Sequence, residues 1–159
     1  MINPFHKKIF RAEQWSEAIQ FLGAREYVFT NGCFDLLHPG HLIYLSQAAS
    51  LSANMVIGLN SDDSVRNLKG LGRPINNFID RANMLSALQQ VTCVIEFKDE
   101  TPLSLIEKLK PNVLVKGGDY KIEDIVGRES VESNGGKVVT IPFVGNYSST
   151  NLIEKIKKA

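Results

Sequence analysis

Short apolar runs alternate with amphipathic stretches along this 159-residue chain. Several of the runs are apolar at every position, which is typical of strands that are buried on both faces of a parallel sheet. The stretches between them repeat apolar residues every three to four positions, as amphipathic helices do. The alternation predicts an α/β chain with a Rossmann-like, open, mostly parallel five-stranded sheet and helices on both faces. The strands are expected at residues 27–30, 55–59, 91–97, 113–115 and 137–142.

The amphipathic stretches define the expected helices. A chain of this length is large enough to bury one core, so residues 1–159 are interpreted as a single domain. Residues 1–25 are expected to hold a basic lead-in and an N-terminal helix, with Trp15 and Ile19 on its apolar stripe. Helices are expected at residues 12–22, 39–51, 65–68, 77–89, 101–110, 122–134 and 151–158.

Two histidines stand at the first junction between a strand and a helix. Pro39 suits the first helical position, and His41 then falls in the first turn, where backbone N–H groups lack partners. His38 and His41 are three residues apart, so both imidazoles can face one point beyond the helix end. Gly40 has no Cβ, so a ligand can approach the backbone there. Two imidazoles, free N–H groups and the positive end of a helix together predict a phosphate site.

An isolated pair of histidines also fits a simpler interpretation, with one residue on the surface and the other in the core. The functional interpretation is favoured because this pair follows the carboxyl end of a strand, where open α/β sheets bind ligands. Metal binding is disfavoured, because the sequence has no third histidine nearby and no cluster of cysteine or glutamate to complete a zinc site.

Other polar residues follow the remaining strands. Asn60 follows the second strand and belongs either to a helix cap or to a site. Residues 69–74 hold two glycines, a proline and the cations Lys69 and Arg73. They predict either a mobile loop that folds over a polyanion or an ordinary exposed loop. Lys116 and Gly117 end the fourth strand, where either a simple turn or the close approach of a ligand explains the glycine.

Three hydroxyl residues, Ser148, Ser149 and Thr150, precede the last expected helix. One of them is enough to cap the helix, and three in a row also suit a site for phosphate. Because the carboxyl ends of parallel strands meet at one edge of a sheet, these hydroxyls and the histidines are expected to form one composite site.

The string Thr-Asn-Gly-Cys-Phe-Asp, from Thr30 to Asp35, is followed by His-Pro-Gly-His, from His38 to His41. Together they resemble the signature of the HxGH nucleotidylyltransferases. The heptose 1-phosphate adenylyltransferase branch of that family is especially similar; there the domain occurs alone or as the C-terminal domain of a bifunctional heptose kinase–adenylyltransferase. The resemblance extends over residues 27–156 and includes the string Val-Lys-Gly-Gly-Asp-Tyr, which ends at Tyr120.

The resemblance implies a nucleotidylyltransferase domain that transfers AMP from MgATP to D-glycero-β-D-manno-heptose 1-phosphate. The products would be pyrophosphate and ADP-heptose, a precursor of lipopolysaccharide or surface glycan. The acceptor phosphate is already an anion near neutral pH, so the reaction needs alignment and charge neutralisation rather than a general base. Mg²⁺ is expected to be bound through the ATP phosphates, and no protein metal site is expected.

The resemblance also implies roles for individual residues. His38, His41 and Lys69 are expected to be catalytic, with His41 at the α-phosphate and His38 at the triphosphate. Contacts to the sugar phosphate are expected from Asp35, Asn60, Lys69, Arg73 and Arg81. Contacts to the nucleotide are expected from Thr30, Asn31, Gly32, Cys33, Phe34, Gly40, His41, Lys116, Gly117, Asp119, Ser148, Ser149 and Thr150.

Two alternatives stay open at the level of the sequence. The first is cytidylyl or adenylyl transfer to another phosphate acceptor, such as glycerol phosphate, ethanolamine phosphate or pantetheine phosphate. The second is a nucleotide-binding module without catalytic activity, which the pair of histidines disfavours. The GxxxxGK[ST] phosphate loop and the GxGxxG dinucleotide fingerprint are both absent from the sequence.

The balance of charge in the chain disfavours nucleic acids and membrane surfaces as partners and leaves small molecules. The chain has 18 basic and 17 acidic residues, and a net charge of +1 provides no global field for a nucleic acid or a membrane surface. No apolar run is long enough to span a membrane, and the N-terminus lacks the apolar core of a signal peptide. Cys33 and Cys93 form no CxxC motif, which fits a reducing compartment. We therefore expect a cytoplasmic protein. The resemblance implies that it binds ATP and a sugar 1-phosphate, and a homo-oligomer is expected, with a dimer favoured.

Overall fold

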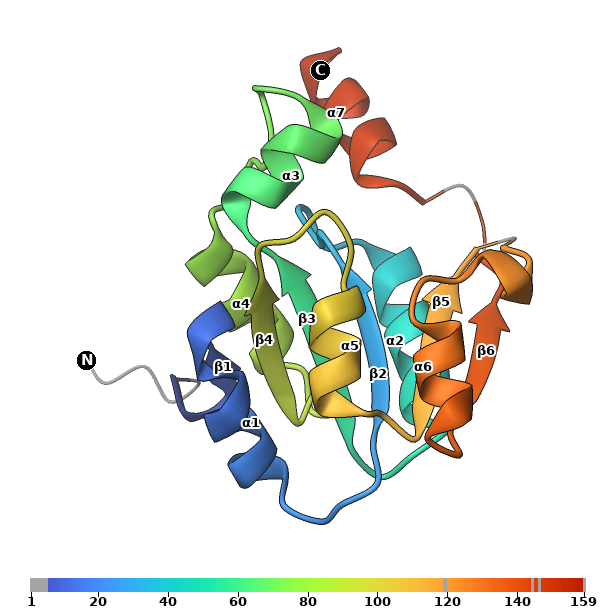
Figure 1. Cartoon of the computed structure of the whole chain (residues 1–159). Coiled ribbons are helices and arrows are strands. Elements are labelled where there is room, and N and C mark those ends of the chain that lie inside the picture. Colours follow the sequence, from blue (N-terminus) through green and yellow to red (C-terminus); the bar gives the residue numbers. More distant parts are fainter. Residues whose placement is uncertain (1–5, 119, 144, 146, 159) are drawn as a thin grey trace.

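The computed structural model describes residues 6–118, 120–143, 145 and 147–158. Within these residues, six strands form one sheet in the order β1-β4-β3-β2-β5-β6, and every pairing is parallel. The prediction of a Rossmann-like, parallel α/β sheet is therefore confirmed (Figure 1). The strands are β1 (Ile9–Phe10), β2 (Val28–Gly32), β3 (Met55–Asn60), β4 (Cys93–Phe97), β5 (Val113–Gly117) and β6 (Lys137–Ile141).

The predicted number of five strands is wrong, because β1 adds a sixth strand at one edge. It lies in the segment that was expected to be a loose lead-in. Ile9 pairs with Val94 and Phe10 with Ile95, and the Phe10 side chain is buried in the core. Two residues are too short to show the alternation that marks a strand, so only the pairing with β4 reveals it.

Helices cover both faces of the sheet, as predicted (Figure 1). On one face lie α2 (Pro39–Ala49) and α4 (Phe78–Ser86), and on the other lie α1 (Trp15–Leu22), α5 (Leu103–Leu109) and α6 (Arg128–Ser133). Both α3 (Asp62–Lys69) and α7 (Ser149–Lys157) stand beyond the carboxyl edge of the sheet (Figure 1). Short 3₁₀ turns occupy His6–Lys8, Ala12–Gln14 and Ile122–Asp124.

Capping residues set helix boundaries that differ from the predicted ones. α3 begins at Asp62, three residues earlier than expected, because the Ser61 hydroxyl accepts a hydrogen bond from Ser64 N at 3.2 Å. The stretch predicted as one helix at residues 122–134 is instead a 3₁₀ turn followed by α6. Gly127 separates them with a φ of +88°, a left-handed conformation that glycine adopts readily.

The core fills both sides of the sheet, which explains the continuous apolar runs. Val28 and Ile57 pack under α2 and α4, whereas Phe29 and Val56 pack under α1 and α5. Successive residues of a strand point to opposite faces, so a strand covered on both faces must be apolar at every position. Each fully buried side chain of this size stabilises the fold by about 1.5–3 kcal/mol.

The close contact between Gly58 and Phe29 in the core predicts that a larger residue at position 58 lowers stability. A Cβ added at Gly58 of β3 would lie 2.6 Å from Cζ of Phe29, on the neighbouring strand β2. We expect Gly58→Ala to lower the free energy of unfolding by about 1–3 kcal/mol, because the buried ring must shift. Gly72→Ala is the control, since a Cβ there meets nothing within 4 Å. Denaturant titration of both variants measures the difference; equal stability of the two would contradict this packing.

The order of the strands places a crevice between β2 and β5. The chain runs from β2 to β3 and β4 on one side, and then continues with β5 and β6 on the other. Open α/β sheets bind ligands beyond the carboxyl ends of the strands, at the point where the strand order reverses. β2 pairs with β3 along its whole length but with β5 only at Val28 and Phe29, so its carboxyl half is free on the β5 side.

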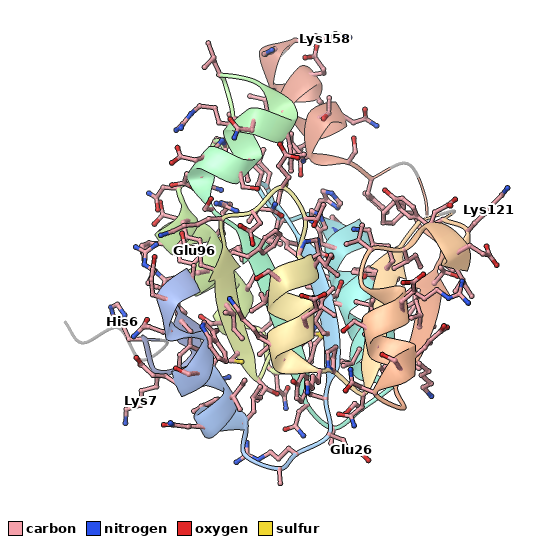
Figure 2. All side chains as sticks on the ribbon, in the orientation of Figure 1. His6, Lys7, Glu26, Glu96, Lys121 and Lys158 are labelled. Atoms are coloured by element: carbon pink, nitrogen blue, oxygen red, sulfur yellow. The ribbon has the colours of Figure 1, made fainter. Side chains whose placement is uncertain are left out.

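The two edges of the sheet differ in what surrounds them. Glu26, which precedes β2, lies at the amino edge, and Lys158, which follows α7, lies beyond the opposite edge (Figure 2). The crevice belongs to the edge on the side of Lys158. None of the helices in the described part of the chain is long and apolar enough to cross a membrane.

Candidate active site

A cavity of about 310 Å³ lies at the carboxyl ends of β2 and β5. Two neighbouring cavities share lining residues with it. One of about 210 Å³ extends toward α7, and another of about 350 Å³ extends toward β3 and the start of α5. The central cavity is lined by Asn31, Gly32, Cys33, Phe34, His41, Tyr44, Lys69, Lys116, Gly117, Tyr120, Phe143 and Ser149. The predicted composite site therefore corresponds to connected space along one edge of the sheet.

The two histidines face each other at the first turn of α2. Their rings are stacked, with centroids 3.7 Å apart and planes inclined by 16°. Nδ1 of His38 accepts a hydrogen bond from the backbone N of His41 at 3.3 Å, so the first histidine also caps the helix. Both imidazoles line the cavity toward α7. The helix cap thus orients one ring, and stacking orients the other.

His41 is the more buried of the pair. Its ring lies 5.1 Å from that of Phe34, and its Nδ1 has no hydrogen-bond partner among the described residues. Burial lowers the pKa of His41 to about 4, with smaller contributions from His38 and Lys69. Burial also lowers the pKa of His38. Both rings are therefore neutral near pH 7 in the free protein and can donate N–H hydrogen bonds to a phosphate without carrying charge.

Two lysines bring positive charge to the cavity from opposite sides. Lys69 is the last residue of α3 and lines both the central cavity and the one toward α7. Lys116, near the end of β5, is half-buried, and burial lowers the pKa of its ammonium group. Its Nζ lies 5.6 Å from the centre of the Tyr120 ring. An anion in this cavity would lie between two cations.

Thr30 lies below the cavity rather than in its lining. Its side chain is fully buried, and its Oγ1 is 2.6 Å from the hydroxyl oxygen of Tyr44. The Tyr44 hydroxyl donates in turn to the carbonyl of Val115 on β5, at 3.3 Å. The pair therefore bridges β2 and β5 beneath the site. Sequence analysis missed Tyr44, although its position three residues after His41 places it on the same face of α2.

Aromatic rings from the segment between β6 and α7 cover two glycines of the site. A Cβ on Gly40 would lie 2.8 Å from Cβ of Tyr147, and one on Gly117 would lie 2.8 Å from Cε1 of Phe143. Gly40 was expected to admit a ligand, but in this structure Tyr147 takes the space next to it. Both rings stay largely exposed. Sequence analysis missed both aromatics, because no periodic pattern marks them.

The hydroxyls before the last helix have different partners. Ser148 caps α7 by accepting from Asn151 N at 2.9 Å, and the Ser149 hydroxyl donates to the carbonyl of Leu36 at 3.0 Å. Thr150 is exposed and lines the cavity toward α7. One hydroxyl thus caps the helix and one holds the loop after β2, while all three residues line the cavity toward α7.

Asn60 and Cys33 meet at the side of the site toward β3. The Asn60 amide donates to the Ser64 hydroxyl at 2.9 Å, and the Cys33 thiol lies 3.8 Å from Asn60 Oδ1. Both residues line the cavity of about 350 Å³. Burial raises the pKa of the Cys33 thiol, so the group stays protonated near pH 7. Asp119, which was also predicted as a nucleotide contact, lies outside the described residues.

Asp35, Arg73 and Arg81 were expected to contact the sugar phosphate, yet the structure directs them into the protein. Among the described residues that line the three cavities, none of these side chains appears. Asp35 is 1% exposed and pairs with Arg73, and Arg81 is 0% exposed. Periodicity could not reveal this, because the charged partner of Asp35 is 38 residues away and that of Arg81 is 19 residues away.

Solved structures share the fold of this chain. A lipopolysaccharide core biosynthesis protein from Thermoplasma volcanium aligns over 77% of this chain and 98% of its own, with a TM-score of 0.62 and 24% identity. Pantothenate synthetase from Thermus thermophilus aligns over 94% of this chain and 70% of its own, with a TM-score of 0.62 and 18% identity.

Curated relatives are closer in sequence. Bifunctional protein HldE of Geobacter sulfurreducens is 55% identical over 135 residues, which are 85% of this chain and 28% of HldE. HldE of Trichlorobacter lovleyi is 51% identical over 151 residues, which are 94% of this chain and 31% of HldE. This chain thus spans less than a third of the length of these relatives. Residues 29–155, which include His38, His41 and Lys69, match the model of the cytidylyltransferase-like family, and the chain therefore belongs to that family.

Proposed function

We propose that this chain is a heptose 1-phosphate adenylyltransferase. It transfers AMP from MgATP to D-glycero-β-D-manno-heptose 1-phosphate and releases pyrophosphate and ADP-heptose, a precursor of lipopolysaccharide. The observation that carries this proposal is the stacked pair His38 and His41 beside Lys69, at the crevice between β2 and β5. Family membership, the sequence resemblance to heptose 1-phosphate adenylyltransferases and the high identity to HldE support it.

The proposed reaction is a direct displacement at phosphorus. An anionic oxygen of the sugar 1-phosphate attacks the α-phosphorus of ATP, a new P–O bond forms, and the bond to the departing pyrophosphate breaks. The nucleophile already carries negative charge, so no residue has to remove a proton. The protein contributes by aligning two polyanions and by stabilising the charge that develops on the phosphate oxygens.

The geometry suggests a division of this work. The neutral imidazoles of His38 and His41, together with the first N–H groups of α2, donate hydrogen bonds to oxygens of the α-phosphate and the triphosphate. Lys69 approaches from the end of α3 and neutralises the phosphates that meet there. Lys116 faces the same space from β5.

Mg²⁺ fits this site as a partner of the nucleotide. In the described part of the chain, no group of three or more histidine, cysteine, aspartate or glutamate side chains is placed to hold a metal ion. When bound with the nucleotide, Mg²⁺ would neutralise part of the charge of the phosphates. The residues described above then position the phosphates themselves.

A substrate panel tests the proposed function. Pyrophosphate release is measured for ATP, CTP, GTP and UTP against heptose 1-phosphate, glycerol phosphate, ethanolamine phosphate and pantetheine phosphate. We expect release only with ATP and heptose 1-phosphate together, and the His41→Ala protein, prepared identically, reports any contaminating enzyme. Release with another acceptor and none with heptose 1-phosphate would overturn the proposal.

The hydroxyls at the start of α7 make a separate prediction. Thr150 is exposed and lines the cavity toward α7, so Thr150→Ala should weaken binding of ATP while binding of AMP, which lacks the β- and γ-phosphates, changes little. Ser148→Ala should instead lower stability by about 0.5–2 kcal/mol, because it removes the helix cap. Titration with both nucleotides and melting curves separate the two effects. Equal losses of ATP and AMP affinity in Thr150→Ala would count against a phosphate cradle.

A further inference from the structure

The guanidinium of Arg81 is fully buried and joins three separate segments. Its Nε donates to the carbonyl of Asn76 at 3.0 Å, its Nη1 to the carbonyl of Cys33 at 2.7 Å, and its Nη2 to Oδ1 of Asp62 at 2.7 Å. Removing such a cation from water is unfavourable by several kcal/mol, and a buried ion pair is weak evidence for stability. The rigid fork of arginine, by contrast, is well suited to hold several groups in one geometry.

Asp35 holds the segment before α4 through a second set of contacts. Its Oδ1 accepts from the backbone N of Ile75 at 2.7 Å and of Asn76 at 3.1 Å, and its Oδ2 pairs with Nε of Arg73. The Asn76 amide also donates to the carbonyl of Asp35 at 3.0 Å. Asn76 is therefore held through its N, its side chain and its carbonyl. We call Asp35, Asn76 and Arg81 the loop anchor.

The loop anchor holds both ends of the stretch that carries Lys69. Asp62 is the first residue of α3, and Asn76 follows the loop after α3, so the two ends of residues 62–76 meet at the Arg81 guanidinium. The tip of the stretch is open: Leu71 is 92% exposed, and a Cβ on Gly70 or Gly72 would meet nothing within 4 Å. Figure 1 shows α3 standing clear of the sheet beyond its carboxyl edge.

We propose that Asp35 and Arg81 are positioning residues that act through Lys69. They fasten the base of residues 62–76 to the loop after β2, which leads to His38 and the first turn of α2, and thereby set where the Lys69 ammonium meets the phosphates. The inference rests on the proposed function of this site. A displacement of about 1 Å in a reacting geometry can lower a rate about 10²-fold, so the position of a single cation matters.

Direct binding of the sugar phosphate by these two residues is the competing explanation. It fits the structure less well, because each Arg81 nitrogen already has a protein acceptor and both carboxylate oxygens of Asp35 have protein donors. A carboxylate would also repel the phosphates. The two explanations differ in whether the effect of Asp35 depends on Lys69.

A double-mutant cycle between Asp35 and Lys69 provides the test. Asp35→Asn keeps an acceptor for the two backbone N–H groups but removes the charge that holds Arg73. We expect it to lower kcat about 10- to 100-fold, with smaller changes in KM. In the Lys69→Ala background the same substitution should lower kcat less than about threefold. Asp35 is proposed to act on the rate only by positioning Lys69, so its effect should be lost once the lysine is removed. Equal losses in both backgrounds, or a rise in KM for the sugar phosphate alone, would overturn the proposal.

Two further variants complete the double-mutant cycle, one as a control and the other as a substitute for Asp35→Asn. Asp63→Asn is the matched control, because Asp63 is an exposed residue of α3 that pairs with Arg66, and it should leave kcat unchanged. Asn76→Ala replaces Asp35→Asn if the latter fails to fold, since it removes only the hydrogen bond to the Asp35 carbonyl. A smaller fall in kcat that disappears in the Lys69→Ala background is then the expected result.

Amide hydrogen exchange of residues 69–76 tests the loop anchor without any substrate. In the free protein, exchange should be faster in Asp35→Asn and Asn76→Ala than in the wild type and in Asp63→Asn. Unchanged exchange would overturn the loop anchor, even if the enzyme has the proposed activity. If heptose 1-phosphate is not an acceptor but exchange responds as expected, the proposed function fails while the loop anchor stands.

Discussion

Replacing His41 by alanine is expected to lower kcat about 10²–10³-fold, the usual effect of losing one stabiliser of developing charge. His41 lies in the first turn of α2 with its ring fixed between His38 and Phe34. In the proposed reaction, the hydrogen bond from His41 to the α-phosphate should strengthen as charge develops on the phosphate oxygens. The loss should therefore fall on kcat, and the dissociation constant for ATP should change much less.

Steady-state kinetics and calorimetric titration with ATP measure these two quantities. His6→Ala is the control, because His6 is an exposed histidine in the 3₁₀ turn before β1. His38→Ala provides a contrast, since it removes a helix cap as well as the proposed contact to the triphosphate and should impair binding, turnover and stability together. Near-normal turnover of His41→Ala would show that this residue does not stabilise the transition state.

Acidification is expected to destabilise the protein through the same residue. The pKa of His41 is lowered to about 4 in the folded protein, whereas an unfolded histidine titrates near its ordinary value of about 6.5. Between these two values the unfolded chain binds more protons, so its free energy falls relative to the folded state. The stabilisation is therefore complete above about pH 6.5 and is lost as the pH falls toward 4. Discounted for the partial exposure of the ring, the loss is about 1–2 kcal/mol.

Denaturant titrations at pH 7, 5.5 and 4.5 measure this loss. Many carboxylates also titrate in this range, so the informative quantity is the difference between the wild type and His41→Gln. The variant should lose less stability on acidification, whereas His6→Gln should follow the wild type. If wild type and His41→Gln lose the same stability between pH 7 and 4.5, the buried ring is not the source of the effect.

Local patterns in the sequence were sufficient for the fold class. Uninterrupted apolar runs such as residues 55–59 predicted strands covered on both faces, and the core on both sides of the sheet confirms this. The same patterns failed for β1, because Ile9 and Phe10 are too few to show any period. Its place in the sheet depends on pairing with Val94 and Ile95, which are 85 residues away in each case.

The residues of the candidate site also fall into two groups, those that the sequence pattern predicted and those that only the tertiary structure placed there. Asn31 and Gly32 end β2, Cys33 follows it, and Lys116 and Gly117 end β5, so strand ends alone were enough to predict that they gather at one edge. No strand end points to Tyr44, Phe143 or Tyr147. They line the site because α2 and the segment before α7 pass over it.

The sequence by itself determined the alternation of strands and helices, the turn that carries His38 and His41, and the edge of the sheet where they lie. These properties depend on neighbouring residues, whose spacing controls which side chains share a face. Only the tertiary structure decided that Asp35 and Arg81 are buried and bonded to protein groups. Asp35 has a partner 41 residues away, at Asn76, and Arg81 has one 48 residues away, at Cys33. Once water is excluded, a charged side chain takes its role from such distant acceptors and donors.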